Sequence, residues 1–190
     1  MKNQIILGIV LFVFAMGNTA FAQKQHKNTK DGIQWMTFEQ AIKANEKEPK
    51  KIMIDLYTDW CGWCKKMDKT TFEHQEVAKF INEHYYAVKF DAEQREDVNY
   101  KGHTFKFVPN GRKGYNELAA ALTGGKMSYP TIVFMVPVED AAELTPIPVP
   151  GYRGPKEFYQ LADFIAQEAY KDKTKTLEDF SKSHPVSFKD

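Results

Sequence analysis

The chain has 190 residues, of which 43% are hydrophobic and 27% charged, a balance typical of one globular domain. Fourteen Phe, nine Tyr and three Trp are enough to build a core without disulfide staples. With 26 Lys and Arg against 25 Asp and Glu, the composition excludes a nucleic-acid-binding protein that depends on bulk positive charge.

The first 22 residues have the pattern of a cleaved signal peptide. Lys2 precedes a short apolar run over 5–16, and Ala20-Phe21-Ala22 is a small-residue cleavage pattern. The run is shorter than the roughly 20 residues that a membrane-spanning helix needs. We therefore predict cleavage after Ala22, and a periplasmic or secreted protein that keeps no membrane anchor.

Residues 23–32 are polar and are predicted to form a flexible lead-in. Thr37 has the position of an N-cap for a helix over 38–46, with Gln40 placed to complete a capping box. The almost unbroken apolar run 52–57 is typical of a central strand that is covered on both faces.

The two cysteines of the chain, Cys61 and Cys64, follow this strand, and a segment of helical composition follows them. A second helical pattern and the strand 86–91 complete a βαβ unit. The dithiol is thus expected at the carboxyl end of a strand and at a helix N-terminus, where open α/β sheets place their chemistry.

The long connection over 92–128 is less regular. It contains an alternating strand pattern at 104–108, a turn signal at 109–111 and an alanine-rich helical pattern at 115–122. We predict that this stretch is an insertion.

The chain then regains clear patterns. A β-branched run follows Pro130, the proline-rich segment 144–149 fits only an edge strand, and a helix is predicted from Pro155 to about residue 170. The polar tail 171–190 has Leu177 and Phe180 as its main means of docking, and half or more of it is expected to be mobile.

The order of these elements, with the motif Trp60-Cys61-Gly62-Trp63-Cys64-Lys65, resembles the thioredoxin superfamily over residues 33–170. It looks most like exported thioredoxin-like proteins with a C-G-W-C-K-K-M motif. The resemblance implies an α/β thioredoxin fold, a central mixed sheet flanked by helices, with an insertion before the strand that follows a cis-proline. Pro130 would be that proline, facing the dithiol, and Gly151 would lie near the site. The family's usual proline within the active-site helix is absent.

The spacing of the cysteines favours redox chemistry over structure, because a bond across two residues closes a tiny loop and restrains the unfolded chain little. Cys61, at the helix N-terminus, is the expected attacking thiolate, and Cys64 is expected to be more buried and to resolve the mixed disulfide. A structural disulfide is the alternative. A zinc site is disfavoured because no second cysteine pair exists, so no metal and no cofactor are predicted.

Asp55 lies six residues before Cys61, where the family keeps a buried aspartate. A carboxylate in an apolar strand has a raised pKa and could accept the proton of Cys64. The alternative is an aspartate that is hydrogen-bonded to the backbone.

Five residues are predicted to bind substrate. Through the resemblance, Tyr129 would pair with an extended substrate chain beside Pro130. At least one of the two tryptophans is expected to be an exposed apolar contact. The complete set is Trp60, Gly62, Trp63, Tyr129 and Pro130.

The function predicted from the sequence is thiol-disulfide exchange with protein substrates through Cys61 and Cys64. Gly62 and the buried Asp55 favour a reductase or isomerase type over a strong oxidase. The expected partners are protein thiols or disulfides and a membrane protein that donates or accepts electrons, with no nucleic acid. The alternatives are a non-enzymatic thioredoxin-fold binding module with a structural disulfide and, less favoured because Cys64 is so close, a peroxidase that uses Cys61.

Overall fold

The computed structural model describes residues 31–138 and 143–188. The predicted signal peptide, its cleavage point after Ala22 and most of the lead-in 23–32 lie outside the described residues. Within them, no helix has the length and the apolar character that crossing a membrane requires.

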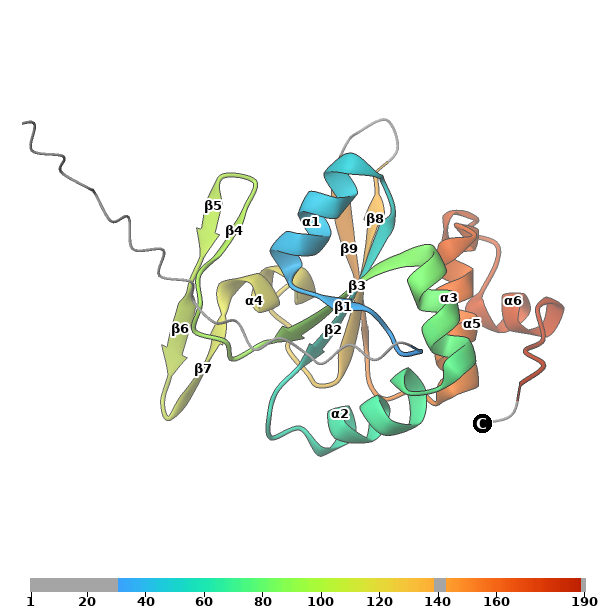
Figure 1. Cartoon of the computed structure of the whole chain (residues 1–190), viewed down its shortest axis with the longest axis horizontal. Helices are drawn as coiled ribbons and strands as arrows, with labels where there is room; N and C mark the ends of the chain where they lie inside the picture. The colour runs from blue at the N-terminus through green and yellow to red at the C-terminus, as the bar shows by residue number, and fades with distance from the viewer. Residues whose placement is uncertain (1–30, 139–142, 189–190) are drawn as a thin grey trace, which may run out of the picture.

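A five-stranded sheet in the order β1-β3-β2-β8-β9 forms the centre of the fold (Figure 1). β1, β3 and β2 run parallel, whereas β8 runs antiparallel to both β2 and β9. The predicted α/β class with a central mixed sheet flanked by helices is confirmed. The strands are β1 (Trp35–Met36), β2 (Lys51–Tyr57), β3 (Tyr85–Asp91), β8 (Thr131–Pro137) and β9 (Leu144–Pro150).

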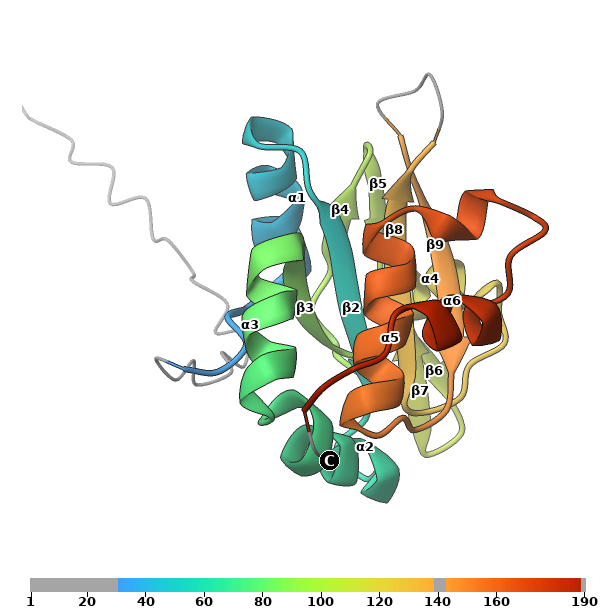
Figure 2. The same ribbon diagram turned by 90° about the vertical axis from the view of Figure 1, so that its right-hand side faces the viewer.

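Helices cover the sheet on both faces, as Figures 1 and 2 show. The central strand β2 divides its side chains between two cores, because successive residues point to opposite faces. Met53 packs in the core beneath α3 and α5, and Ile52, Ile54 and Leu56 pack in the core beneath α1 and α4. The helices are α1 (Phe38–Lys47), α3 (Gln75–His84), α4 (Glu117–Thr123) and α5 (Pro155–Ala166).

The N-terminus of α1 has the local structure that its sequence predicts. The Thr37 hydroxyl accepts the Gln40 N–H at 3.2 Å, and the Gln40 side chain accepts the Thr37 N–H at 2.9 Å. This capping box satisfies two N–H groups that the helix itself leaves unpaired.

The connection before β8 contains two hairpins and α4. The hairpins are β4 (Val98–Tyr100) with β5 (His103–Phe105), and β6 (Phe107–Asn110) with β7 (Lys113–Asn116). The single strand expected at 104–108 was wrong, because it breaks at Lys106. There the backbone N–H donates to the Glu117 carboxylate at 2.8 Å, and the carbonyl accepts the Glu117 N–H at 2.8 Å.

Two boundaries in this region also differ from the prediction. Pro109 belongs to β6, and the turn begins at Gly111, which has a φ of 61° that suits glycine. The helix expected from Tyr115 begins at Glu117, because the Asn116 side chain accepts the Leu118 N–H at 3.0 Å and caps it.

The polar C-terminal segment is ordered through a short helix, α6 (Leu177–Ser183). Thr176 and Asp179 form a capping box at its start. Phe180 is buried against Phe164, with ring centroids 5.4 Å apart, and stacks on His184 at 4.0 Å. Phe180 therefore docks α6 against α5, as expected.

Replacing Phe180 with Ala should lower the free energy of unfolding by about 3 kcal/mol, because it empties a fully packed aromatic site. Urea unfolding followed by circular dichroism measures the loss. The exposed Lys182→Ala variant of the same helix should change stability little. Equal stability of Phe180→Ala and the wild type would contradict the docking of α6.

Candidate active site

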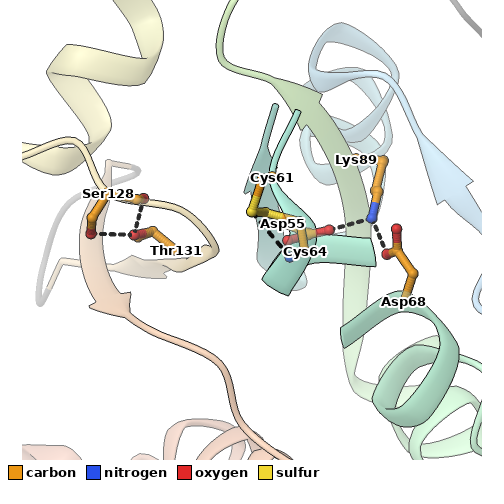
Figure 3. The surroundings of a disulfide bond; sticks show 7 residues. All are labelled: Asp55, Cys61, Cys64, Asp68, Lys89, Ser128 and Thr131. Atoms are coloured by element: carbon orange, nitrogen blue, oxygen red, sulfur yellow. Dashed lines mark hydrogen bonds and ion pairs between the residues drawn. A yellow bond between two sulfur atoms is a disulfide. The ribbon is translucent and has the colours of Figure 1, made fainter. Parts of the chain in front are cut away.

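The two cysteines lie at the start of α2 (Gly62–Met67) and are joined by a disulfide (Figure 3). Cys61 is the N-cap residue, and its Sγ accepts the Cys64 backbone N–H at 3.0 Å. Cys61 is 4% exposed and Cys64 is 2% exposed, so the expected difference in their burial is slight. The Cys61 sulfur thus lies where the helix N-terminus is positive.

The helix continues past α2 into a π-helical turn over Asp68–Phe72, where the helical sequence pattern is interrupted. Two threonine side chains of this turn form hydrogen bonds to the loop after β9. The Thr71 hydroxyl donates to the Arg153 carbonyl at 2.7 Å, and the Thr70 and Tyr152 hydroxyls lie 3.0 Å apart. The redox helix is therefore fixed to that loop.

A buried ion pair lies behind the disulfide. Lys89 is the register partner of Asp55 on the parallel strand β3, and its Nζ lies 2.5 Å from Asp55 Oδ2. The same Nζ also pairs with Asp68 from the π-helical turn. The Asp55 and Lys89 side chains are 1% and 4% exposed, whereas that of Asp68 is 40% exposed. Lys89 thus bridges the buried Asp55 and the more exposed Asp68 (Figure 3).

Burial raises the pKa of Asp55 above its ordinary value, although the Lys89 charge acts in the opposite direction. For Lys89, burial alone would lower the pKa, and the charges of Asp55 and Asp68 raise it overall. The second Asp55 oxygen, Oδ1, is buried and accepts no hydrogen bond from the described residues. Asp55 therefore retains a position at which it can take up a proton.

Tyr129 and Pro130 lie across from the disulfide, and the peptide bond between them is cis. Tyr129 packs against the small cluster of Tyr57, Cys61 and Cys64. The Pro130 carbonyl accepts the Gly151 N–H at 2.8 Å, which brings that glycine beside the site. Figure 3 also shows the Thr131 hydroxyl, which donates to the Ser128 carbonyl at 2.7 Å and braces this turn.

The two tryptophans that flank the cysteines are both exposed, Trp60 at 54% and Trp63 at 56%. The Trp60 ring lies edge-on to Tyr129, with centroids 5.9 Å apart. The Trp63 ring lies 5.4 Å from that of Tyr152. Gly62, between the cysteines, is exposed, and no atom lies within 4 Å of where its Cβ would be. The predicted substrate-binding residues thus surround the disulfide.

The sequence analysis missed Lys89 and the pairing role of Asp68. A usable signal existed, because Asp55 and Lys89 are the single charged residues within two neighbouring apolar strand cores. A charge buried in an apolar strand is strongly destabilising unless an opposite charge lies close to it. In the described part of the chain, no group of three or more His, Cys, Asp or Glu side chains is arranged to hold a metal ion.

The fold and the paired cysteines define a protein of the thioredoxin superfamily. A thioredoxin from Thermus thermophilus has the same fold, with a TM-score of 0.50 at 18% sequence identity over 75% of this chain and 92% of that one. The family model Thioredox_DsbH, described as a protein of unknown function (DUF255), matches residues 18–186. The chain belongs to this family.

Two curated proteins show the extent of sequence similarity. The thiol:disulfide interchange protein DsbD of Colwellia psychrerythraea is 30% identical over 70 residues, which are 37% of this chain and 12% of that protein. Human spermatogenesis-associated protein 20 is 30% identical over 68 residues, 35% of this chain and 9% of that protein. The chain thus matches only a small part of the length of these relatives.

Replacing Lys89 with Met should lower the free energy of unfolding by about 3 kcal/mol at neutral pH, because Asp55 loses its buried cation. The raised pKa means that folded Asp55 holds its proton more tightly than the unfolded chain does. The stability that protonated Asp55 contributes is present at low pH and is lost as the pH rises through the pKa of Asp55 in the folded protein. Without Lys89 that pKa rises further, so the loss should be larger at about pH 8 than at about pH 5.

Urea unfolding at the two pH values measures this effect. The double variant Asp55→Asn/Lys89→Met should recover part of the stability, because it buries no charge. Asp68→Asn is the matched control, since its side chain is half-exposed and should cost less. A Lys89→Met loss that is the same at both pH values would contradict this account of Asp55.

Proposed function

We propose that this protein is a thiol-disulfide oxidoreductase that acts on protein substrates through Cys61 and Cys64. The observation that carries the proposal is the position of Cys61 Sγ, which caps α2 and accepts the Cys64 N–H at 3.0 Å. Helix N–H groups at this point stabilise a negative charge, so the reduced Cys61 is expected as a thiolate near neutral pH. A thiolate is the reactive form of cysteine.

In the reducing direction, the Cys61 thiolate attacks one sulfur of a substrate disulfide. A Cys61–substrate bond forms, the substrate S–S bond breaks, and the second substrate sulfur leaves as a thiolate. The Cys64 thiolate then attacks Cys61 Sγ, which releases the first substrate sulfur and leaves the Cys61–Cys64 disulfide. Two electrons pass to the substrate, and a dithiol protein must reduce the enzyme again.

Asp55 is proposed as the group that takes the proton of Cys64. Asp55 is among the residues that surround the disulfide in Figure 3, and its Oδ1 is buried without a hydrogen-bond donor among the described residues. Burial also brings the pKa of Asp55 closer to that of a useful general base. Lys89 would then compensate the charge of Asp55 whenever the proton is released.

Substrate would lie against Trp60, Gly62, Trp63, Tyr129 and Pro130, which surround the disulfide. Tyr129 packs against the cluster of Tyr57, Cys61 and Cys64, so an extended substrate chain could hydrogen-bond to the Tyr129 backbone beside the reacting sulfur. We propose a reductase or isomerase type over a strong oxidase. The reduction potential distinguishes them, with about −270 mV expected for a thioredoxin-like reductant and about −120 mV for a strong oxidant.

We further propose that the protein is exported to the periplasm or secreted, and that it exchanges electrons with a membrane protein. The thioredoxin-like domain would cover 33–170, with the insertion at about 92–128 and the tail at 171–190. The apolar N-terminal run and the Ala20-Phe21-Ala22 pattern support the export.

A non-enzymatic binding module with a structural disulfide is the second candidate. Burial of both sulfurs favours it, since an inert disulfide would also be shielded from solvent. An enzyme is favoured over a binding module, because a disulfide across two intervening residues adds little to the stability of the fold.

The Cys64→Ser variant should accumulate mixed disulfides with protein substrates, because Cys61 still attacks and no resolving thiol remains. Cys61→Ser should form none and should lose the reduction of insulin disulfides by at least about 100-fold. Non-reducing gels with mass spectrometry detect the adducts. A wild-type disulfide that resists dithiothreitol, or two thiols that alkylate only well above neutral pH, would exclude the enzyme and favour the binding module.

Expression in a bacterium with an outer membrane should yield a mature protein that begins at Gln23 and lies in the periplasmic fraction. N-terminal sequencing checks the cleavage point. Replacing Ala20 and Ala22 with bulky residues should block processing, because the peptidase needs small side chains there. An uncleaved wild-type protein in the cytoplasm would contradict the export.

A further inference from the structure

Each exposed tryptophan beside the disulfide carries a lysine over its ring. Lys113 Nζ lies 3.8 Å from the centroid of Trp60. Lys66 Nζ lies 4.7 Å from the ring of Trp63 and 5.0 Å from that of Tyr152. The two sides of the redox site therefore present the same combination of an apolar ring and a positive charge.

Lys113 reaches the site from the insertion, at the start of β7 in the hairpin β6–β7. This hairpin is closely packed, because a Cβ at Gly114 would overlap the Phe107 ring and the Val108 carbonyl. The Arg95 guanidinium lies over the Phe107 ring, 4.5 Å from its centroid. The position of Lys113 is thus set by a packed hairpin.

The charges of Lys66 and Lys113 are not compensated. Both residues are exposed, and no described carboxylate lies within ion-pair distance of either. By contrast, Lys89 and Lys101 have carboxylate partners. A ring face holds an ammonium group in place but leaves its charge available.

Carboxylates also lie near this surface, since the exposed Asp59 directly precedes Trp60, and Asp91 and Glu93 lie near Tyr129. Burial, and after it the charges of Glu93 and Asp91, raise the pKa of Tyr129 to about 12. Both are half-buried, and the Asp91 side chain accepts the Glu93 N–H at 3.0 Å. In this region the exposed Lys65, Lys66 and Lys113 outnumber the exposed Asp59, so the exposed charge around the tryptophans is positive overall.

We infer that the partner is a polypeptide segment with acidic side chains next to its reactive cysteine. This rests on the proposed function and adds a specificity-determining residue, Lys113. The segment lies between the two tryptophans, with an acidic side chain on the Lys113 side. Trp60 and Tyr129 provide the apolar contact there. The positive charge of Lys113 favours a partner with an acidic side chain over one with a basic side chain.

Three cysteine peptides, identical except for two Asp, Ser or Lys residues beside the cysteine, test the inference. Each is supplied as a mixed disulfide with thionitrobenzoate, and the reduced protein releases the coloured thiolate. At low salt the wild type should react with the Asp peptide at least about threefold faster than with the Lys peptide. The ratio should shrink toward one at about 0.5 M salt, where the charges are screened.

Lys113→Glu should reverse this preference, and Lys113→Met should reduce it while keeping the length of the side chain. Lys79→Glu is the matched control, since it makes the same charge change on an exposed position of α3 and should keep the wild-type ratio. A wild-type ratio near one, or the same ratio in Lys113→Glu, overturns the inference.

The Cys61→Ser/Cys64→Ser protein separates this inference from the proposed function. Its affinity for the peptides in their cysteine-free form, with Ser at the cysteine position, is measured through tryptophan fluorescence and needs no thiol exchange. Tighter binding of the Asp peptide, lost in the added Lys113→Glu variant, supports the inference even if no peptide disulfide is reduced. Equal binding of the Asp and Lys peptides overturns it, whether or not the wild type reduces disulfides.

Discussion

The buried pair of Asp55 and Lys89 is the interaction on which the site depends. Removing two charges from water costs several kcal/mol, and close contact alone does not always offset it. Here Lys89 also has Asp68 and three aromatic faces around it. Its Nζ lies 5.2 Å from the ring of Trp35, 4.9 Å from Tyr57 and 5.4 Å from Phe72. One ammonium group therefore joins β1, β2, β3 and the helix that follows the cysteines.

This arrangement links the chemistry to the position of the helix. Asp68, which pairs with Lys89, begins the π-helical turn, and the same turn presents Thr70 and Thr71 to the loop after β9. The disulfide thus lies between the buried Asp55 and Lys89 pair (Figure 3) and the exposed Trp60 and Trp63. Their relative positions follow from a shared set of contacts rather than from the cysteine motif alone.

The elements of the central sheet could be predicted from the sequence, because their signals are local. The apolar run of β2, the capping box at Thr37 and the proline at the start of α5 each involve neighbouring residues. The insertion could not be predicted in the same way. Its strand breaks at Lys106 because Glu117, eleven residues later, takes both backbone groups of that residue.

In the candidate site, too, local signals could be predicted and contacts between distant segments could not. Cys61 and Cys64 could be identified from their spacing, and Asp55 from a charge in an apolar strand. Lys89 gives a signal of the same kind, but its pairing with Asp55 depends on strand register, and the position of Lys113 depends on the path of a hairpin. Interactions between distant segments need the parallel register or the turn geometry, which composition and periodicity do not specify.

The threonines of the π-helical turn have a consequence for the redox cycle. Their hydrogen bonds to Tyr152 and Arg153 hold the far end of the helix, and none of these bonds involves a sulfur atom. Breaking the disulfide therefore leaves the helix anchored from its other end. We expect the oxidised and reduced forms to present almost the same surface, so that a partner would distinguish them by the chemistry of the sulfurs and not by a change of shape.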